Sequence, residues 1–312
     1  MSATAFALVL AAACAHAAWN IIAHGVSRTG IPFLWWGSVF GTVLWAGAIP
    51  FTGGIGVGSP GASGAAPWGG FLLGAAVSAL LHVGYMFVLQ RGYAVGDLST
   101  VYATARGTGP LITVIVAVTL LGERPAPLAL VGVLVVVCGI VAIGVIGRPD
   151  PAPRTVPGPA SGSGASPRRF RLDPGIAAGL ATGVAIAAYT VWDAHALREW
   201  NLSPVAFMVG CTALEIPLFT LAVWRRRAEL LPTLRAQWGR LVAFGVLSPL
   251  SYILVLTAIT IAPVALVAPV REVSVVLVSL FGALVFRERR PVARVAASVV
   301  VVGGIMLLAL PG

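Results

Sequence analysis

The strongest constraint on this chain is a series of apolar stretches, each about as long as a bilayer core is thick. A helix crosses the hydrocarbon core with roughly 20 mostly apolar residues. Backbone groups in lipid must be hydrogen-bonded within their own segment, which favours helices over open strands. The sequence therefore predicts an all-α integral membrane protein with ten transmembrane helices. The expected helices are 4–24, 31–51, 68–90, 98–121, 127–147, 174–195, 204–224, 238–259, 263–286 and 291–310.

The composition agrees with lipid as the main solvent. Hydrophobic residues make up 58% of the chain, charged residues make up 10%, and the mean hydropathy is +0.96. Soluble domains carry about 25% charged residues, so this chain could not cover a water-exposed surface. The net charge of +10 comes from arginine, without any lysine. Because these arginines gather in short connectors rather than on one face, nucleic acid is not an expected partner.

One long connector divides the chain. Residues 148–173 are rich in Pro, Gly, Ser and Arg, which predicts a disordered cytoplasmic linker. The linker separates a first repeat at 1–147 from a second repeat at 174–312, each with five expected helices. No other connector is long enough for a soluble domain, so any function must reside among the helices.

An internal repeat relates the two halves. Four matches occur in the same order in each half, and the first two pairs are both separated by 165 residues. The pairs are Arg106 with Arg271, Glu123 with Glu288, Trp19-Asn20 with Trp192-Asp193, and Tyr85 with Tyr252. Because each half holds an odd number of helices, the halves must cross the membrane in opposite orientations. The sequence thus predicts two inverted five-helix repeats, an architecture common among secondary transporters.

The arginines also predict an orientation. Sixteen of them lie in the connectors after the first, third, fifth, seventh and ninth expected helices or in the first turn of the helix that follows. The other connectors contain only Arg124 and Arg198. Cytoplasmic loops carry an excess of basic residues, so both termini are expected outside the cytoplasm.

Four short motifs together resemble a known family. They are His-Ala-Ala-Trp-Asn at 16–20, Arg-Gly-Thr-Gly-Pro at 106–110, Gly-Glu-Arg-Pro at 122–125 and its echo Arg-Glu-Arg-Arg-Pro at 287–291. In this order they resemble the EamA-type family of the drug/metabolite transporter (DMT) superfamily, over the whole chain outside 148–173. The resemblance implies ten helices in two inverted halves around a central cavity, with alternating access. Such proteins move amino acids, other metabolites, sugar derivatives or drugs, often in exchange for protons or a second solute.

Four charged residues fall nearest to mid-depth in the expected helices: Arg106, Glu215, Arg271 and Glu272. Charges are costly in the bilayer interior, and they commonly mark functional sites there. Their formal charges sum to zero, so mutual ion pairs that fix helix register are one interpretation. The other interpretation is a role in substrate binding or in coupling.

For a binding role, Arg106 and Arg271 are the first candidates, because they occupy equivalent positions in the two repeats. A guanidinium group can hold a carboxylate or phosphate through two parallel hydrogen bonds. Neighbouring residues of a helix point about 100° apart, so Arg271 and Glu272 cannot face the same way. Glu272 has no acidic counterpart, since Gly107 stands at its repeat position, and it is a candidate for proton coupling. Glu215 is the second coupling candidate.

Aromatic residues supply the other expected parts of a cavity wall. Large rings with one polar atom suit a solute that has both apolar and polar parts. The substrate-binding candidates of this kind are Trp19, Tyr85, Tyr102, Tyr189 and Trp192. Each ring could instead pack in the core or anchor the membrane interface. Asn20 and Asp193 fall near opposite membrane surfaces if the halves are inverted, and they are gate candidates.

The expected helix 98–121 contains Gly107-Thr108-Gly109-Pro110. Proline removes a backbone hydrogen bond and glycine weakens the turn, so this motif predicts either a break with exposed carbonyl groups or a simple kink. Glu123, at the end of the same helix, is expected to close a helix end or to pair with an arginine.

No catalytic or cofactor motif is apparent. The chain has no Gly-x-x-x-x-Gly-Lys-Ser/Thr loop for ATP. Cys14, Cys138 and Cys211 lie within apolar stretches, without metal-ligand spacing, and are expected to be small packing residues. The four histidines are scattered, and His16 either titrates near neutral pH or simply packs. We therefore expect no catalytic residue, no cofactor and no metal site.

The expected function is secondary active transport of small metabolites across the bacterial plasma membrane, coupled to protons or to exchange. The partners of a multi-pass carrier of this kind are a small solute, the lipid bilayer and a coupling proton. Because both orientations are present within one chain, a monomer can suffice, and a homodimer is the other possibility. Two alternatives remain open: a membrane-embedded enzyme for lipid-linked substrates, and a non-transporting assembly factor.

Overall fold

The computed structural model describes residues 1–22, 30–56, 68–96, 98–146, 173–285 and 291–309. Within these residues the fold consists of helices, without β-strands, so the prediction of an all-α protein is confirmed. The α-helices are α1 (Ala3–Ile22), α2 (Ile31–Ala46), α3 (Trp68–Val95), α4 (Leu98–Thr119), α5 (Pro127–Ile146), α6 (Pro174–Glu199), α7 (Pro204–Val223), α8 (Leu230–Ile261), α9 (Val264–Arg271), α10 (Val273–Val285) and α11 (Pro291–Ala309). The two short 3₁₀ helices are η2 (Ile49–Thr52) and η3 (Trp224–Glu229).

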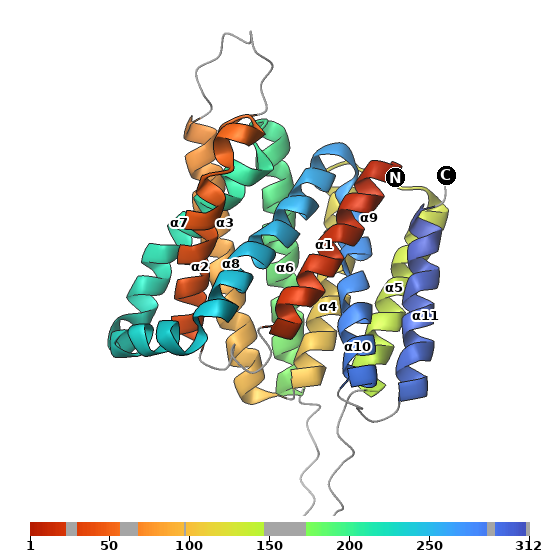
Figure 1. Ribbon diagram of the computed structural model, residues 1–312. Helices are drawn as coiled ribbons and strands as arrows, with labels where there is room; N and C mark the ends of the chain where they lie inside the picture. The colour runs from red at the N-terminus through yellow and green to blue at the C-terminus, as the bar shows by residue number, and fades with distance from the viewer. Residues whose placement is uncertain (23–29, 57–67, 97, 147–172, 286–290, 310–312) are drawn as a thin grey trace, which may run out of the picture.

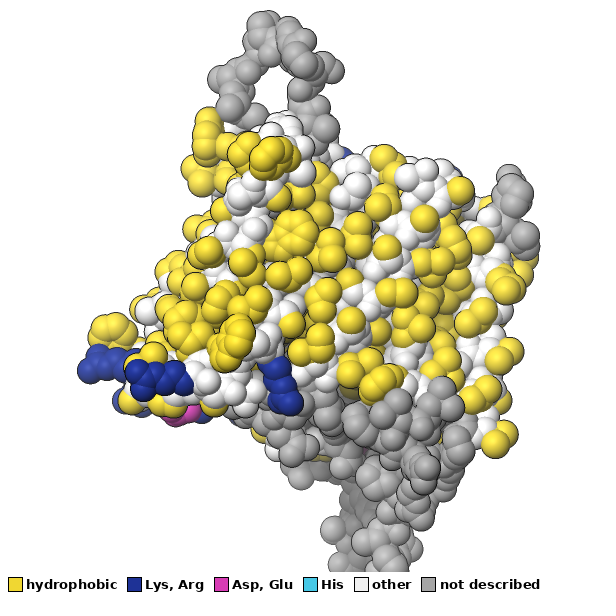
Figure 2. All heavy atoms as spheres, viewed as in Figure 1, with side chains coloured by type: hydrophobic (Ala, Val, Ile, Leu, Met, Phe, Trp, Pro, Cys, Tyr) yellow, Lys and Arg dark blue, Asp and Glu magenta, His cyan; other side chains and the backbone are white. Residues whose placement is uncertain are grey.

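The helices present an apolar outer surface. Seven helical segments of the described chain are long and apolar enough to cross a membrane, and the shorter α2 and α11 are apolar as well. Large hydrophobic side chains such as Leu72, Leu80 and Val299 are exposed. Figure 2 shows hydrophobic side chains over most of the face in view. Soluble proteins rarely expose so large an apolar surface, and lipid is the solvent that fits it. The chain is a multi-pass membrane protein.

The expected helix 263–286 is two helices rather than one. α9 ends at Arg271 and α10 begins at Val273, so Glu272 lies at a break. The backbone N–H of Glu272 donates to the carbonyl oxygen of Pro269, 3.1 Å away and only three residues earlier. Pro269 itself has no N–H group, which weakens the regular hydrogen-bond pattern of α9. The described residues therefore contain eleven α-helices instead of the expected ten.

The alternative of a break in the expected helix 98–121 is wrong. α4 continues from Leu98 to Thr119 with Pro110 inside it. The Thr113 hydroxyl donates to the Gly109 carbonyl oxygen, 2.9 Å away. Neighbouring helices make proline tolerable in membrane helices, and α4 packs closely on α6.

The two halves of the chain pack against each other in a reciprocal pattern (Figure 1). α1 packs on α8 as α3 packs on α6, and α4 contacts α6 as α9 and α10 contact α1. α2 lies against α7, and α5 lies against α11. Both termini lie at one end of the bundle, whereas η3 lies at the other. Most interhelical contacts thus join one half to the other.

Gly183 allows α6 to approach α4 closely. A Cβ atom at Gly183 would lie 2.9 Å from the Cβ of Thr108 and 3.1 Å from the backbone nitrogen of Gly109. These distances are too short for an ordinary carbon contact, so a larger residue would push the helices apart. Small residues at helix interfaces serve this purpose in membrane proteins.

Glu123 and Arg198 join three helix ends on the side of the termini. The Glu123 carboxylate accepts hydrogen bonds from the backbone N–H groups of Val264 and Ala265, 2.8 and 2.9 Å away, at the start of α9. Arg198 donates to Glu123 at 3.0 Å and to the Ile259 carbonyl oxygen of α8, also at 3.0 Å. The two side chains satisfy backbone groups that a helix end leaves free. Glu123 therefore has the expected structural contacts.

Some expected features lie outside the described residues. The linker at 148–173 is described only at Asp173, whose carboxylate accepts from the backbone N–H groups of Gly175 and Ile176 and caps α6. Glu288, the repeat partner of Glu123, also lies outside.

Candidate functional site

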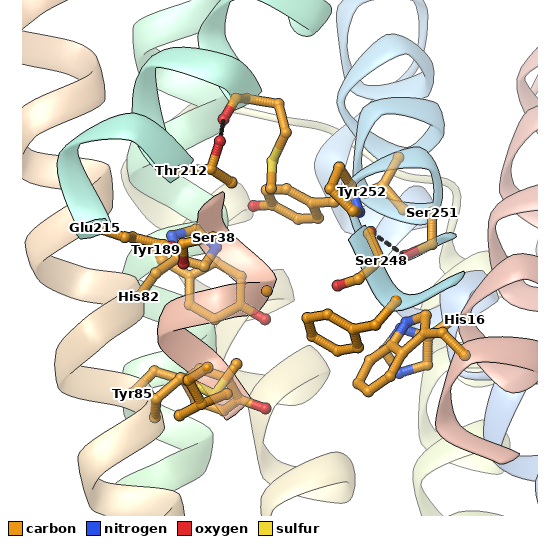
Figure 3. A pocket seen from close by; sticks show the side chains of 18 of the residues that line it. His16, Ser38, His82, Tyr85, Tyr189, Thr212, Glu215, Ser248, Ser251 and Tyr252 are labelled. Atoms are coloured by element: carbon orange, nitrogen blue, oxygen red, sulfur yellow. Dashed lines mark hydrogen bonds between the residues drawn. The ribbon is translucent and has the colours of Figure 1, made fainter. Parts of the chain in front are cut away.

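A cavity of about 130 Å³ lies between helices of both halves (Figure 3). Its walls come from α1, α2, α3, α4, α6, α7, α8 and α9. The polar and aromatic residues in the walls are His16, Trp19, Ser38, His82, Tyr85, Arg106, Tyr189, Thr212, Glu215, Phe219, Phe244, Ser248, Ser251, Tyr252 and Arg271.

Two buried arginines, Arg106 from α4 and Arg271 from α9, belong to the wall of this cavity. Glu272 does not line the cavity, and its side chain is 0% exposed. Its Oε1 atom lies 3.3 Å from Nη1 of Arg106 and 3.7 Å from Nε of Arg271. The Glu272 carboxylate therefore pairs with both guanidinium groups, and the three side chains together carry a net charge of +1.

Further groups from α1, α4 and α6 position the arginines. Nε2 of His16 lies 2.7 Å from Nη2 of Arg106. A guanidinium group can only donate, so Nε2 accepts this bond and the ring hydrogen is on Nδ1. Arg106 also lies over the ring of Tyr102, 5.3 Å from its centre, and Arg271 Nη2 donates to the Tyr189 hydroxyl at 3.5 Å. Nε of Arg271 is buried without a hydrogen-bond partner among the described residues.

Glu215 from α7 lies across the cavity from His16 (Figure 3). The Ser38 hydroxyl donates to its Oε2 atom at 2.7 Å, and the thiol of Cys211 lies 3.8 Å from Oε1. Within the described chain Glu215 takes part in no ion pair. This side of the cavity thus carries an acidic group, whereas the arginine side carries a positive charge.

Aromatic rings line the space between these charged groups. His82 stacks on Tyr189 with ring centres 4.2 Å apart, and Tyr85 meets Tyr189 edge-on at 5.5 Å. Trp19 meets Phe244 edge-on at 5.2 Å. Such distances are typical of packed aromatic pairs. The rings give the cavity apolar surface beside its charges.

Six of the predicted site residues line the cavity and five do not. The six are Arg106, Arg271, Trp19, Tyr85, Tyr189 and Glu215. The five are Tyr102, Trp192, Glu272, Asn20 and Asp193.

Hydrogen bonds explain where three of these five residues point. Trp192 donates its Nε1 hydrogen to a backbone carbonyl of α3 at 3.0 Å and so ties α6 to α3. Asn20 donates to the carbonyl oxygen of His16 in its own helix at 2.7 Å. Asp193 is fully buried and accepts from the Tyr252 hydroxyl at 2.6 Å, while its Oδ1 atom has no partner in the described part of the chain.

Seven polar wall residues were not among the predicted site residues: His16, Ser38, His82, Thr212, Ser248, Ser251 and Tyr252. His82 precedes Tyr85 by three residues, a spacing that places both on one face of α3 and could have identified it. Tyr252 was matched to Tyr85 in the repeat but was not assigned to the site. Ser38 carries no sequence signal, because its role depends on the distant Glu215.

Comparisons with known proteins agree with this architecture. Residues 173–310 match the EamA-like transporter family. Among 29 matching chains of solved structures, one described only as a crystal structure of a protein is 20% identical, with a TM-score of 0.66. The alignment covers 97% of this chain and 98% of that one, and at this identity it shows the fold alone. No curated protein matches the chain.

Proposed function

We propose that this chain, a DMT-type small-solute transporter of the EamA-like family, is a secondary active carrier of small organic acids and related metabolites. The family match supports a membrane transporter of small solutes. The observation that carries the finer proposal is the pair of buried arginines, Arg106 and Arg271, in the wall of one cavity. We place the carrier in the bacterial plasma membrane.

An anionic group is the solute feature that this wall can recognise. Arg106 and Arg271 belong to the cavity wall and supply guanidinium donors there, whereas the buried Nε of Arg271 lies 3.7 Å from Glu272. Charge-assisted hydrogen bonds to a carboxylate or phosphate would use these donors. The rings of Trp19, Tyr85 and Tyr189 supply apolar surface for the remainder of the solute.

Coupling to protons follows from competition for the arginines. Glu272 balances one of the two positive charges before the solute binds. A bound anion supplies the same negative charge, so Glu272 can then take up a proton without changing the net charge of the site. The proton on Glu272 and the bound anion would cross together and be released together on the other side, after which Glu272 pairs with the arginines again; this is proton–solute symport.

Glu215, the other coupling candidate, occupies a different part of the cavity. Its carboxylate forms no ion pair with Arg106 or Arg271, whereas Glu272 pairs with both, so Glu215 does not compete with an anionic solute for these arginines. Its carboxylate is suited to a positively charged group, whether on the solute or free.

Alternating access would use the two halves as inverted repeats. The reciprocal contacts of α1 with α8 and of α3 with α6 support this arrangement, as do the equivalent positions of Arg106 and Arg271. Rocking of one half against the other around a fixed site is the usual motion of such carriers.

Counterflow in proteoliposomes tests the function. Vesicles preloaded with a mixed pool of amino acids and organic acids should take up labelled pool members in a saturable manner. Arg106→Ala should lower this flux by roughly 10–100-fold, because a charge-assisted hydrogen bond contributes about 1.5–3 kcal/mol. Arg124→Ala, an exposed arginine outside the cavity, is the matched control and should retain flux. Absence of flux for every pool member, with folded and inserted protein, would overturn the proposal.

A further inference from the structure

Three side chains with metal-ligating groups converge beside the cavity: His82 from α3, and Cys211 and Glu215 from α7. One ligand atom from each lies within 4.8 Å of the other two. We propose that these residues bind a borderline-soft divalent transition-metal ion such as Zn²⁺. His82 and Cys211 are 129 residues apart, so sequence spacing gave no sign of this site.

The distances are close to those of a tetrahedral zinc site. The sulfur of Cys211 is 3.9 Å from Nδ1 of His82 and 3.8 Å from Oε1 of Glu215. In a tetrahedral site, Zn–S bonds of about 2.3 Å and Zn–N or Zn–O bonds of about 2.0–2.2 Å separate the ligand atoms by roughly 3.6 Å. The Cys211 sulfur would therefore approach each of the other two atoms by a few tenths of an ångström, whereas His82 and Glu215, whose ligand atoms lie within 4.8 Å of each other, would close by up to about 1 Å.

Helix geometry accounts for the convergence. Cys211 and Glu215 are four residues apart on α7, so their side chains share one face of that helix. This face meets α3, which carries His82. All three residues lie within continuous helices, α3 and α7, and such elements hold metal ligands in place better than loops do.

Charge balance favours a divalent cation at this position. Glu215 has no ion-pair partner within the described residues, although an isolated buried carboxylate is costly. A thiolate at Cys211 and the carboxylate at Glu215 carry two negative charges, and His82 binds as a neutral ring. One divalent ion would neutralise the cluster.

Two serines support the ligands from behind. The Ser38 hydroxyl donates to Oε2 of Glu215 at 2.7 Å, which leaves Oε1 for an ion. The Ser78 hydroxyl lies 3.4 Å from the sulfur of Cys211, and Nδ1 of His82 lies 2.9 Å from the Ser78 carbonyl oxygen. Ligation through Nδ1 would break the hydrogen bond that His82 donates to the Ser78 carbonyl oxygen: the ring hydrogen would move to Nε2, which keeps the ring neutral, and the thiol hydrogen would be released to solvent. The hydroxyls of Ser38 and Ser78 would remain as second-layer contacts that orient Glu215 and Cys211.

The ligand types predict which ion binds, and the position of the ligands beside the cavity predicts an open coordination position. Thiolate and imidazole select zinc-like ions over Mg²⁺ and Ca²⁺, which prefer oxygen ligands throughout. His82 and Glu215 line the cavity, whereas Cys211 is buried behind it. A fourth position would therefore face the cavity, and sites with three protein ligands and one open position exchange their fourth ligand.

Cobalt titration of the purified full-length protein in detergent tests the site. Co²⁺ bound to a thiolate gives a charge-transfer absorption band in the near ultraviolet. We expect one such ion per chain, displaced by Zn²⁺ and not by Mg²⁺. Cys211→Ser should abolish the band. Cys14→Ser and Cys138→Ser are matched controls that should retain it, because both thiols are exposed and neither belongs to the cluster.

Three further variants separate ligation from a folding defect. His82→Gln and Glu215→Gln should each weaken Zn²⁺ binding at least tenfold, and Ser38→Ala should weaken it by roughly 10-fold. Each variant must elute as wild type does in size-exclusion chromatography. A band that survives Cys211→Ser, or a folded wild-type protein that binds no Co²⁺, would overturn the site. Because the readout is metal binding, its outcome is independent of transport.

Discussion

At the scale of single residues, Glu272 and its two arginines dominate the energetics of the cavity. The carboxylate is fully buried and lies within 4 Å of Arg106 and Arg271. Removal of one member of a buried ion pair leaves an uncompensated charge and typically costs about 3–5 kcal/mol. A substitution at Glu272 should therefore keep the shape of the side chain, so that transport can be tested without loss of the fold.

Glu272→Gln should separate exchange from proton-driven accumulation. The amide resembles the protonated carboxyl group, so solute can still bind and cross, but no proton can be released. We expect counterflow to persist within about threefold, whereas an inward proton gradient should no longer raise uptake. Transport measured with and without a pH gradient checks this split. If a proton gradient still raised uptake by Glu272→Gln, a group other than Glu272 would couple transport to protons.

At the scale of helices, repeat-related positions adopt different local structures. α4 continues through Pro110, whereas the equivalent span of the second half breaks at Glu272, three residues after Pro269. The break places Glu272 between the arginines instead of continuing a regular helix. Close packing of α4 on α6 keeps Arg106 at the boundary of the two halves.

Gly183→Val should separate α6 from α4. The added side chain would meet Thr108 and the backbone of Gly109, and overpacking of this kind costs about 1–3 kcal/mol. We expect a lower midpoint of thermal unfolding in detergent, together with weaker counterflow. Gly84→Val is the matched control, because a Cβ atom at Gly84 has no heavy atom within 4 Å. Equal midpoints for the two variants would contradict the role assigned to Gly183.

At the scale of the whole molecule, charge and topology indicate one orientation. Both termini lie at one end of the bundle, and Figure 2 shows arginine side chains at the end where η3 lies. Arg225, Arg226 and Arg227 of η3 are exposed. Basic residues are retained on the cytoplasmic side, so we expect η3 inside and both termini outside.

Reporter fusions check this orientation. Alkaline phosphatase, which is active only outside the cytoplasm, should be active when fused after Gly312 and inactive when fused after Arg227. The opposite pattern would reverse the orientation and the direction of the proposed proton coupling. Equal activity of both fusions would contradict a ten-span topology.

The sequence alone determined the solvent and the class of fold. Apolar runs of membrane length restrict the backbone to helices, whatever packs around them, so the expected helices were largely in the right places. The repeat also marked Arg106 and Arg271, since buried charges in an apolar chain are rare and stand out. These inferences depend on local sequence and on the cost of charge in lipid.

Only the tertiary structure decided which side chains meet. The sequence made Glu272 a coupling candidate, but only the structure shows its side chain buried outside the cavity lining, at a break in the helix, within 4 Å of both arginines. His82, Cys211 and Glu215 come together because α3 packs on α7, and Ser38 joins them from α2. Local sequence does not predict that these side chains are close, because the packing of helices far apart in the sequence sets the distances between them.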